Sequence, residues 1–276
     1  MMSIQEKFVS GVSGVPVYSI LSHYPKQNRT ALVIPVINEG SKVISQLYEI
    51  NTLNLNVDII IADGGSTDES LEYFRSSEGS INTLLTKHGE GKLSAQLRMA
   101  FHYCLQKRYE FIITMDGNNK DGALGIENIG NALKQGFDFV QGSRYVSGGH
   151  SENTPILREI GIKWIHAPLI SLSARHRFTD TTNGFRGFSR GLIQSSEMSI
   201  FREVFDGYEL LNYLPIRSAR LGFKICEVPV VRRYPNGKTP TKIVGFKSHL
   251  NILKVLITAT VGRYNPKVEK SKGYKL

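Results

Sequence analysis

The sequence predicts an α/β protein built on a doubly wound, mostly parallel sheet flanked by helices. From residue 30 onward, strand-like and helix-like stretches alternate four times in about a hundred residues. The strand-like runs are almost continuously apolar, as expected for buried strands. Each run ends in a polar or glycine-rich loop, and in open α/β sheets ligands bind at the carboxyl ends of the strands.

The first half of the chain gives the clearest pattern. Expected strands cover residues 30–36, 57–63, 81–86 and 111–115. The helix after the first strand has its apolar face formed by Val43, Ile44, Leu47 and Ile50. Gly64 and Gly65 allow a tight turn after the second strand, and a helix begins near Asp68. A third helix runs from Lys92 to about Lys107.

The second half is less regular. It is expected to contain a strand at 137–145, a helix at 155–173 broken at Pro168, a loop entering a strand at 179–188, a helix at 208–221, a strand at 223–231, a basic loop at 232–239 and a helix at 246–261. The last helix carries Leu250, Leu253, Leu256 and Ile257 on one face. We expect residues 1–28 to be an N-terminal extension, 29–242 the main domain, and 243–276 an amphipathic helix and tail.

Composition restricts the partners. The net charge of +10 and the pI of about 9.5 favour nucleotide phosphates or an anionic membrane surface. Nucleic acid is least favoured, because no basic run with interleaved aromatic residues is present. The sequence contains no signal peptide and no apolar run of the ~18 residues needed to span a bilayer. Cys104 and Cys226 match no metal or redox spacing, which indicates buried, reduced thiols and a cytosolic location.

Several polar side chains follow the expected parallel strands. Asn38, Glu39, Asp63, Asp68 and Asp116 should therefore meet at one edge of the sheet. Such a group of carboxylates ahead of a lysine favours a nucleotide site, but no G-x-G-x-x-G fingerprint follows the first strand. For Asp116, two roles remain open: it could hold a divalent cation against phosphate oxygens or cap the following loop.

An ordered set of motifs resembles the family-2 glycosyltransferases of GT-A fold. These are V-I-P-V-I-N-E from residue 33, I-A-D-G-G-S-T-D from 61, Gly91-Lys92 and M-D-G from 115. The segments G-S-R-Y-V-S-G-G from 142, N-G-F-R from 183, G-Y-E-L from 207 and E-V-P-V from 227 are similar to the polyprenyl-phosphate hexosyltransferase subgroup. The resemblance covers residues 30 to 242.

The resemblance implies a nucleotide-sugar donor, a polyprenyl-phosphate acceptor and a role for each matching residue. The residues that it implies for nucleotide binding are Pro35, Asn38, Glu39, Asp63 and Lys92. Asp116 and Asn118 match the metal-binding D-x-D motif, which indicates Mg²⁺ or Mn²⁺. Phosphate binding falls to Arg144, Arg158, Arg233 and Lys238; for Arg144 and Arg158, a solvated surface residue is the alternative. We expect Asp116, Arg144 and Lys120 to be the catalytic set.

Two departures from the family pattern bear on the chemistry. Asn118 replaces the second carboxylate of D-x-D, so less charge is available to hold a metal. Lys120 could neutralise phosphate in place of the metal, and Asp121 could supply the second carboxylate. The acidic pair that provides a general base in other members reads Asp206-Gly207. An ionised acceptor phosphate needs no base, whereas a hydroxyl acceptor would need Asp180 or Asp206.

We therefore expect an inverting hexosyltransferase that is peripheral on the cytoplasmic face of the membrane and uses a UDP- or GDP-sugar. The C-terminal helix would lie at the bilayer, or it would pack on the sheet or form a homo-oligomer interface. The rival functions are a glycosyltransferase with a soluble sugar acceptor in surface polysaccharide synthesis and a non-catalytic nucleotide-sugar-binding homologue.

Overall fold

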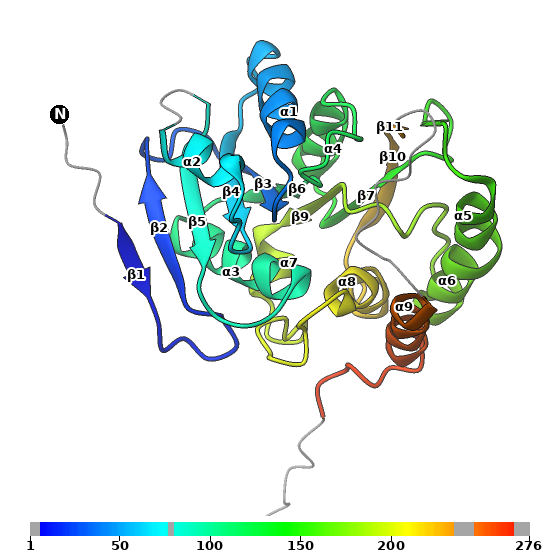
Figure 1. Cartoon of the computed structure of the whole chain (residues 1–276). Coiled ribbons are helices and arrows are strands. Elements are labelled where there is room, and N and C mark those ends of the chain that lie inside the picture. Colours follow the sequence, from blue (N-terminus) through cyan, green and yellow to red (C-terminus); the bar gives the residue numbers. More distant parts are fainter. Residues whose placement is uncertain (1–5, 77–79, 235–245, 268–276) are drawn as a thin grey trace, which may run out of the picture.

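The computed structural model describes residues 6–76, 80–234 and 246–267. Its centre is a nine-stranded sheet with the strand order β1-β2-β5-β4-β3-β6-β9-β7-β10 (Figure 1). The strands are β1 Lys7–Val9, β2 Tyr18–Ser22, β3 Thr30–Val36, β4 Asp58–Asp63, β5 Thr83–Lys87, β6 Phe111–Thr114, β7 Phe139–Ser143, β9 Arg186–Ser189 and β10 Ile225–Pro229. β2 and β9 run against the other strands of this sheet, so the sheet is mixed but mostly parallel.

Helices cover both faces of the sheet (Figure 1). They are α1 Ser41–Thr52, α2 Glu69–Ser76, α3 Leu93–Gln106, α4 Gly125–Lys134, α5 Ile156–Gly161, the π-helix η1 Ile162–His166, α6 Ala167–Ala174, α7 Arg190–Gln194, α8 Glu209–Arg220 and α9 Phe246–Thr260. A second, two-stranded sheet pairs β8 His150–Glu152 with β11 Val231–Arg233.

The two helical layers give the protein two hydrophobic cores. Alternate residues of a strand point to opposite faces, so Leu32 and Ile34 of β3 pack with α1, α2 and α4, while Ala31 and Val33 pack with α3 and α8. These β3 side chains are fully buried. The continuous apolar run predicted for this strand therefore reflects burial on both sides, as expected for a doubly wound sheet.

The register brings the predicted loops to one edge. Val36 at the end of β3 lies beside Asp63 at the end of β4, and Val33 lies beside Thr114 at the end of β6. Since these three neighbouring strands are parallel, the loops that follow them open at the same edge. This edge carries the site.

Several elements differ from the sequence expectation. Residues 7–9 and 18–22 of the expected N-terminal extension add strands β1 and β2 to the sheet, where Tyr18 is buried. Helix α4 was not expected, and the expected strand at 223–231 is two strands in different sheets. The expected break at Pro168 is instead the π-helix η1 just before it, because proline is readily accommodated in the first turn of α6.

Helix α9 buries only part of its predicted apolar face. Val255, Leu256 and Ala259 are buried, and the helix packs on α8 and α6. Leu250 and Ile257 of the predicted apolar face are each 49% exposed. No helix among the described residues combines the length and apolar character that crossing a membrane requires.

Candidate active site

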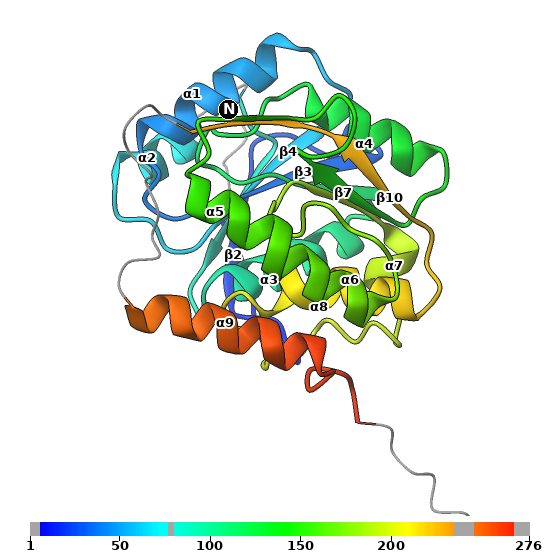
Figure 2. The same ribbon diagram turned by 90° about the vertical axis from the view of Figure 1, so that its right-hand side faces the viewer.

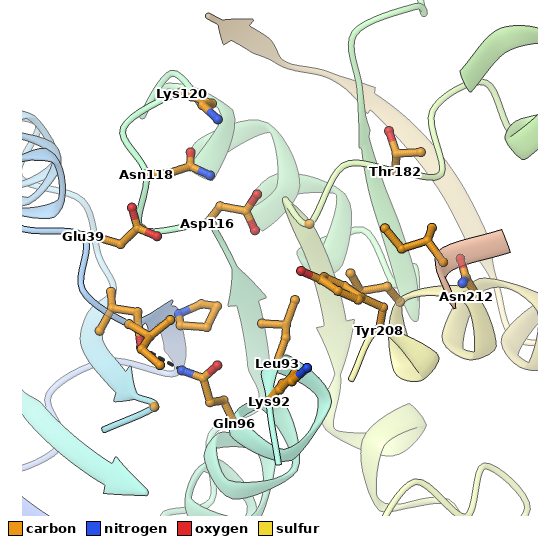
Figure 3. A pocket seen from close by; sticks show the side chains of 18 of the residues that line it. Glu39, Lys92, Leu93, Gln96, Asp116, Asn118, Lys120, Thr182, Tyr208 and Asn212 are labelled. Carbon is orange, nitrogen blue, oxygen red and sulfur yellow. Dashed lines mark hydrogen bonds between the residues drawn. The ribbon is translucent and has the colours of Figure 1, made fainter. Parts of the chain in front are cut away.

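A cavity of about 630 Å³ lies at the edge where β3, β4 and β6 end (Figure 3). One end has an apolar lining that includes Pro35, Val36, Ile37 and Leu93. The middle contains Asp116 and Asn118 with the basic residues Lys120, Arg158 and Arg232. The other end is formed by His166, Thr181, Thr182, Tyr208, Leu211, Asn212 and Ile252. Of the predicted residues, Pro35, Glu39, Lys92, Asp116, Asn118, Lys120 and Arg158 line it.

Asp116 sits just beyond β6, at the centre of this cavity. Its backbone oxygen accepts a hydrogen bond from Gln46 Nε2 at 3.0 Å, which fixes the loop. Its side chain is 28% exposed, and Oδ2 accepts a hydrogen bond from Arg232 Nη2 at 3.0 Å. A Cβ atom at Gly184 would lie 2.5 Å from Oδ1, so glycine at this position leaves room for the carboxylate as it stands.

Arg232 of β11 is a site residue that the sequence did not single out. Its buried guanidinium donates to Asp121 Oδ2 at 2.5 Å as well as to Asp116. Burial alone would lower the pKa of Arg232, but the carboxylates of Asp121 and Asp116 raise it well above its ordinary value. In the strand, Arg232 and Arg233 point to opposite sides, and the sequence held no signal for choosing between them. Arg232 therefore stays a cation that faces Asp116.

Three cations surround the ring of buried Tyr234. Lys120 Nζ lies 5.1 Å from the ring centroid, and the guanidinium carbons of Arg158 and Arg232 lie at 5.6 and 5.9 Å. Burial, together with the charges of Arg232 and Arg158, lowers the pKa of Lys120 to about 8. Three cations beside the two carboxylates of Asp116 and Asp121 leave an excess of positive charge, which suits a polyanionic ligand such as a diphosphate.

Arg144 and Arg233 do not line the cavity, and Lys238 lies outside the described residues. Arg144 is buried, and its Nε and Nη2 donate to the two carboxylate oxygens of Asp180 at 2.6 and 2.8 Å. Arg233 pairs instead with exposed Glu152 at 2.9 Å. In this structure the cations of the cavity centre are thus Lys120, Arg158 and Arg232.

Asn38 and Asp63 shape the loops beside the cavity without lining it. The Asp63 carboxylate is fully buried and accepts hydrogen bonds from the backbone nitrogens of Gly65 and Ser66 at 3.0 and 3.1 Å. Asn38 Oδ1 accepts one from the Thr67 nitrogen at 2.8 Å. These bonds tie the loop after β3 to the loop after β4.

Two carboxylates named as bases for a hydroxyl acceptor also lie elsewhere. Asp180 is fully buried against Arg144, and the exposed Asp206 does not line the cavity. Among the described residues, Glu39 and Asp116 are the only carboxylates in the lining.

His166 marks the far end of the cavity. It ends the π-helix η1, a rare local geometry that is frequent at functional sites. Its Nδ1 lies 2.6 Å from Thr181 Oγ1, and burial lowers its pKa to about 4, so the ring is neutral near pH 7. This end therefore presents neutral polar groups rather than charge.

The residues around Asp116 fit a hard divalent cation. Asn118 Oδ1 is buried without a hydrogen-bond partner among the described residues, and it stands on the same loop as the Asp116 carboxylate (Figure 3). Mg²⁺ and Mn²⁺ take such oxygen ligands and complete their shell with substrate phosphates and water. The described residues contain no cluster of three or more His, Cys, Asp or Glu side chains that could hold a metal ion. A metal here would thus depend on donor phosphates.

Comparison with known proteins agrees with this geometry. The chain is 24% identical to the undecaprenyl-phosphate mannosyltransferase of Micrococcus luteus over 79% of its own length and 90% of that protein. It is 24% identical to the polyprenol monophosphomannose synthase of Mycolicibacterium smegmatis, over 73% of this chain and 76% of that one.

Solved structures confirm the GT-A fold. Glucosyl-3-phosphoglycerate synthase from Mycobacterium tuberculosis, solved with Mn²⁺, UDP and glucosyl-3-phosphoglycerate, matches with a TM-score of 0.59 at 17% identity, over 87% of this chain and 81% of that one. A mannosyltransferase from Pyrobaculum calidifontis, solved with GDP-Man and Mn²⁺, matches with a TM-score of 0.50 at 13% identity, over 83% of this chain and 62% of that one. Residues 31–202 match the family described as Glycosyl transferase family 2, which is more than half of the chain. The chain therefore belongs to glycosyl transferase family 2.

Proposed function

We propose that this protein transfers a hexose from a UDP- or GDP-sugar to a polyprenyl phosphate, with inversion at the anomeric carbon. The observation that carries the proposal is the composition of the cavity. One space joins an apolar end, a carboxylate facing Lys120, Arg158 and Arg232, and a neutral polar end, and neither Asp180 nor Asp206 lines it. The mannosyltransferases among its relatives support a hexose donor and a lipid-phosphate acceptor.

The donor would lie along the cavity with its nucleoside at the apolar end, near Lys92. Lys120 and Arg232 would bind the diphosphate, and their charge would stabilise the leaving group as the sugar–phosphate bond breaks. Asp116 and Asn118 would hold Mg²⁺ or Mn²⁺, which when bound supplies further positive charge to the departing diphosphate. Asp116 orients Arg232 through the 3.0 Å contact.

The acceptor phosphate would enter beside Arg158 of α5. A phosphate monoester is ionised near neutral pH, so it can attack the anomeric carbon without a general base. This agrees with a cavity that Asp180 and Asp206 do not line. Arg144 would reach a phosphate only after leaving Asp180, so we assign the first contact to Arg158.

We further propose that the face formed by α5, η1, α6 and α9 rests on the membrane. Figure 2 shows these helices together on one side of the molecule. The side chains of Leu157, Trp164 and Leu172 are 85, 77 and 79% exposed, and Leu250 and Ile257 of α9 are about half exposed. In and beside these helices, Arg175, Lys254, Arg263 and Lys163, which pairs with Glu159, are exposed basic residues that suit an anionic surface. Helix α5 carries Arg158 at the cavity and the exposed Leu157 next to it in the sequence. A lipid bound at this face would therefore have its phosphate close to Arg158.

The test is release of nucleoside diphosphate from UDP- and GDP-sugars, with and without a short polyprenyl phosphate, and with Mn²⁺ or EDTA. We expect release only with the lipid phosphate, and loss of release in EDTA if Asp116 and Asn118 hold a metal. Release with soluble sugars and none with lipid phosphate would favour the soluble-acceptor alternative. Nucleotide binding without release under any condition would favour the non-catalytic one.

A further inference from the structure

Gln96 of α3 reaches the apolar end of the cavity from below the sheet edge (Figure 3). Its side chain is buried, and Nε2 donates hydrogen bonds to the backbone oxygens of Val36 and Ala62 at 2.8 and 3.0 Å. Gly64 leaves the room for this amide, because a Cβ atom there would lie 2.7 Å from Nε2. The amide thus joins the ends of β3 and β4.

These two bonds determine which way the amide faces. An amide nitrogen has two N–H donors, and here each has a carbonyl acceptor. The flipped orientation would bring Oε1 against the Val36 and Ala62 oxygens, where two acceptors repel each other. Oε1 is therefore held on the other side of the amide, as Figure 3 shows, and no described residue donates a hydrogen bond to it.

Gln46 provides a contrast within the same site. Its Nε2 donates to the Asp116 backbone oxygen, and its Oε1 accepts from the Asn119 nitrogen at 2.9 Å. Both ends of the Gln46 amide are used inside the protein, as is usual for a buried side chain. Gln96 keeps one acceptor without a donor from the described residues at the cavity wall, so this acceptor is available to a ligand that displaces water.

The position of Gln96 indicates which part of a ligand it meets. The cations that suit a diphosphate surround Asp116, while Val36, which accepts from Gln96, and Leu93, beside it in Figure 3, belong to the apolar lining that suits the faces of a planar base. We infer, on the basis of the proposed function, that Gln96 Oε1 reads the base of the donor nucleotide by accepting a hydrogen bond from its ring N–H.

This assignment makes Gln96 a specificity-determining residue with a defined preference. Uracil carries a hydrogen at N3 and guanine at N1, whereas cytosine N3 and adenine N1 carry a lone pair that Oε1 would repel. The fixed acceptor should therefore favour uridine or guanosine nucleotides over cytidine or adenosine nucleotides. Discrimination is strong when a buried polar group is left unpaired by the wrong ligand.

The test compares nucleotides that differ by one methyl group, using the full-length protein and equilibrium binding. The first pair is UDP and N3-methyl-UDP, with 5-methyl-UDP as a control whose methyl group lies away from the ring N–H. The second pair is GDP and N1-methyl-GDP. For whichever base binds, we expect methylation at the ring nitrogen to weaken binding to the wild-type protein about tenfold or more. The 5-methyl group should change binding less than the N3-methyl group does.

The variant Gln96→Met removes the Oε1 acceptor at similar volume, together with the two Nε2 donors to Val36 and Ala62, so its thermal unfolding is compared with that of the wild-type protein. It should weaken binding of the unmethylated nucleotide about tenfold and leave little further effect of the N-methyl group, because both changes remove the same hydrogen bond. A structural disturbance alone would not abolish this methyl effect. If the variant does not fold, the methylated ligands still test the wild-type protein.

Equal binding of N-methylated and unmethylated nucleotides, or penalties of variant and methyl group that simply add, would overturn the assignment of Gln96 while leaving the proposed function intact. If no nucleoside diphosphate binds at all, the proposed function fails and this inference fails with it.

Discussion

Asp116 has one carboxylate oxygen on Arg232 and the other beside the space that Gly184 leaves open. A single carboxylate at a strand end is common, and the neighbouring side chains give this one its chemistry. The pairing of Asp116 with Arg232 keeps a cation in the cavity with or without a metal. The roles that we propose for Asp116 and Arg232 both depend on this contact.

Replacing Asp116 by Asn keeps the shape of the side chain and removes its charge. We expect hexose transfer to fall about 10²–10³-fold, because the loop loses its anchor for Arg232 and for a divalent cation. Transfer of radiolabelled sugar to polyprenyl phosphate measures the effect, with thermal unfolding as a check on folding. The matched change Asp206→Asn should leave transfer within about twofold; a large loss there would point to a hydroxyl acceptor instead.

The lowered pKa of Lys120 leads us to expect that hexose transfer depends on pH. Its pKa is lowered to about 8 by burial and by Arg232 and Arg158, so its ammonium is present below that pH and is lost above it. The charge that we propose binds phosphate therefore disappears as pH rises, and kcat/KM should fall above a pH of about 8. A profile of kcat/KM against pH checks this. In Lys120→Arg the charge persists, so the alkaline fall should move upward; an unchanged profile would contradict the assignment.

At the level of elements, the loop between α6 and β9 connects the cavity to the core through buried charges. Arg144 pairs with Asp180, and Arg186, fully buried, donates to the Thr181, Asn183 and Leu211 backbone oxygens at 2.7 to 3.0 Å. The prediction of a loop entering a strand at 179–188 is confirmed, since β9 begins at Arg186. The bonds that join this segment to Arg144 and Leu211 are long-range, and spacing in the sequence does not reveal them.

Removing one partner of a buried ion pair leaves the other uncompensated. Asp180→Ala should therefore lower the free energy of unfolding by about 3–5 kcal/mol. Denaturation in guanidinium chloride measures this. The control is Arg29→Ala, which breaks the exposed pair with Glu110 and should leave the unfolding curve nearly unchanged. Equal effects of the two variants would show that the buried pair of Arg144 and Asp180 contributes no more to stability than an exposed pair.

The helical face formed by α5, η1, α6 and α9 is proposed to bind membranes, and this can be tested separately. Trp164→Ser should weaken binding to vesicles containing anionic lipid about tenfold, since a large exposed aromatic surface is lost. Nucleotide binding should be unchanged. Phe8 on β1 is 63% exposed at the opposite end of the molecule in Figure 1, so Phe8→Ser is the control. If Trp164→Ser and Phe8→Ser bind vesicles equally, this face does not rest on the membrane.

For the molecule as a whole, the sequence predicted the strands that are buried on both faces and the loops that follow them. β3 spans the same residues as expected, because seven apolar or β-branched residues in a row allow few alternatives. β2 was missed because it joins the sheet through β5, which is distant in the sequence, as in the pair Tyr18↔Lys87. β1 has only three residues and pairs with β2 alone, so it could not be predicted without β2. Helix α4 was missed although Ile126, Ile129 and Leu133 follow helical spacing, because Gly125 and Gly130 disfavour a helix.

The site was predictable only in part. Motif order located Asp116, Asn118 and Lys120, since a strand end fixes the place of its loop. Arg232 and Gln96 were not predictable, because their side chains enter the cavity from elements whose rotation depends on packing. The charge pattern of the sequence indicates an anionic partner. Whether a given arginine points into the cavity or away from it is decided by the tertiary structure.

The measurement that tests the central claim most directly is the chemical identity of the product. Purified protein would be incubated with a radiolabelled UDP- or GDP-hexose and a polyprenyl phosphate, and the organic extract would be analysed by mass spectrometry. We predict a polyprenyl-phosphate hexose with inverted anomeric configuration, formed by the wild-type protein and lost in Asp116→Asn. Label that is found only on a water-soluble glycan, or a lipid product that Asp116→Asn forms equally well, would contradict the account.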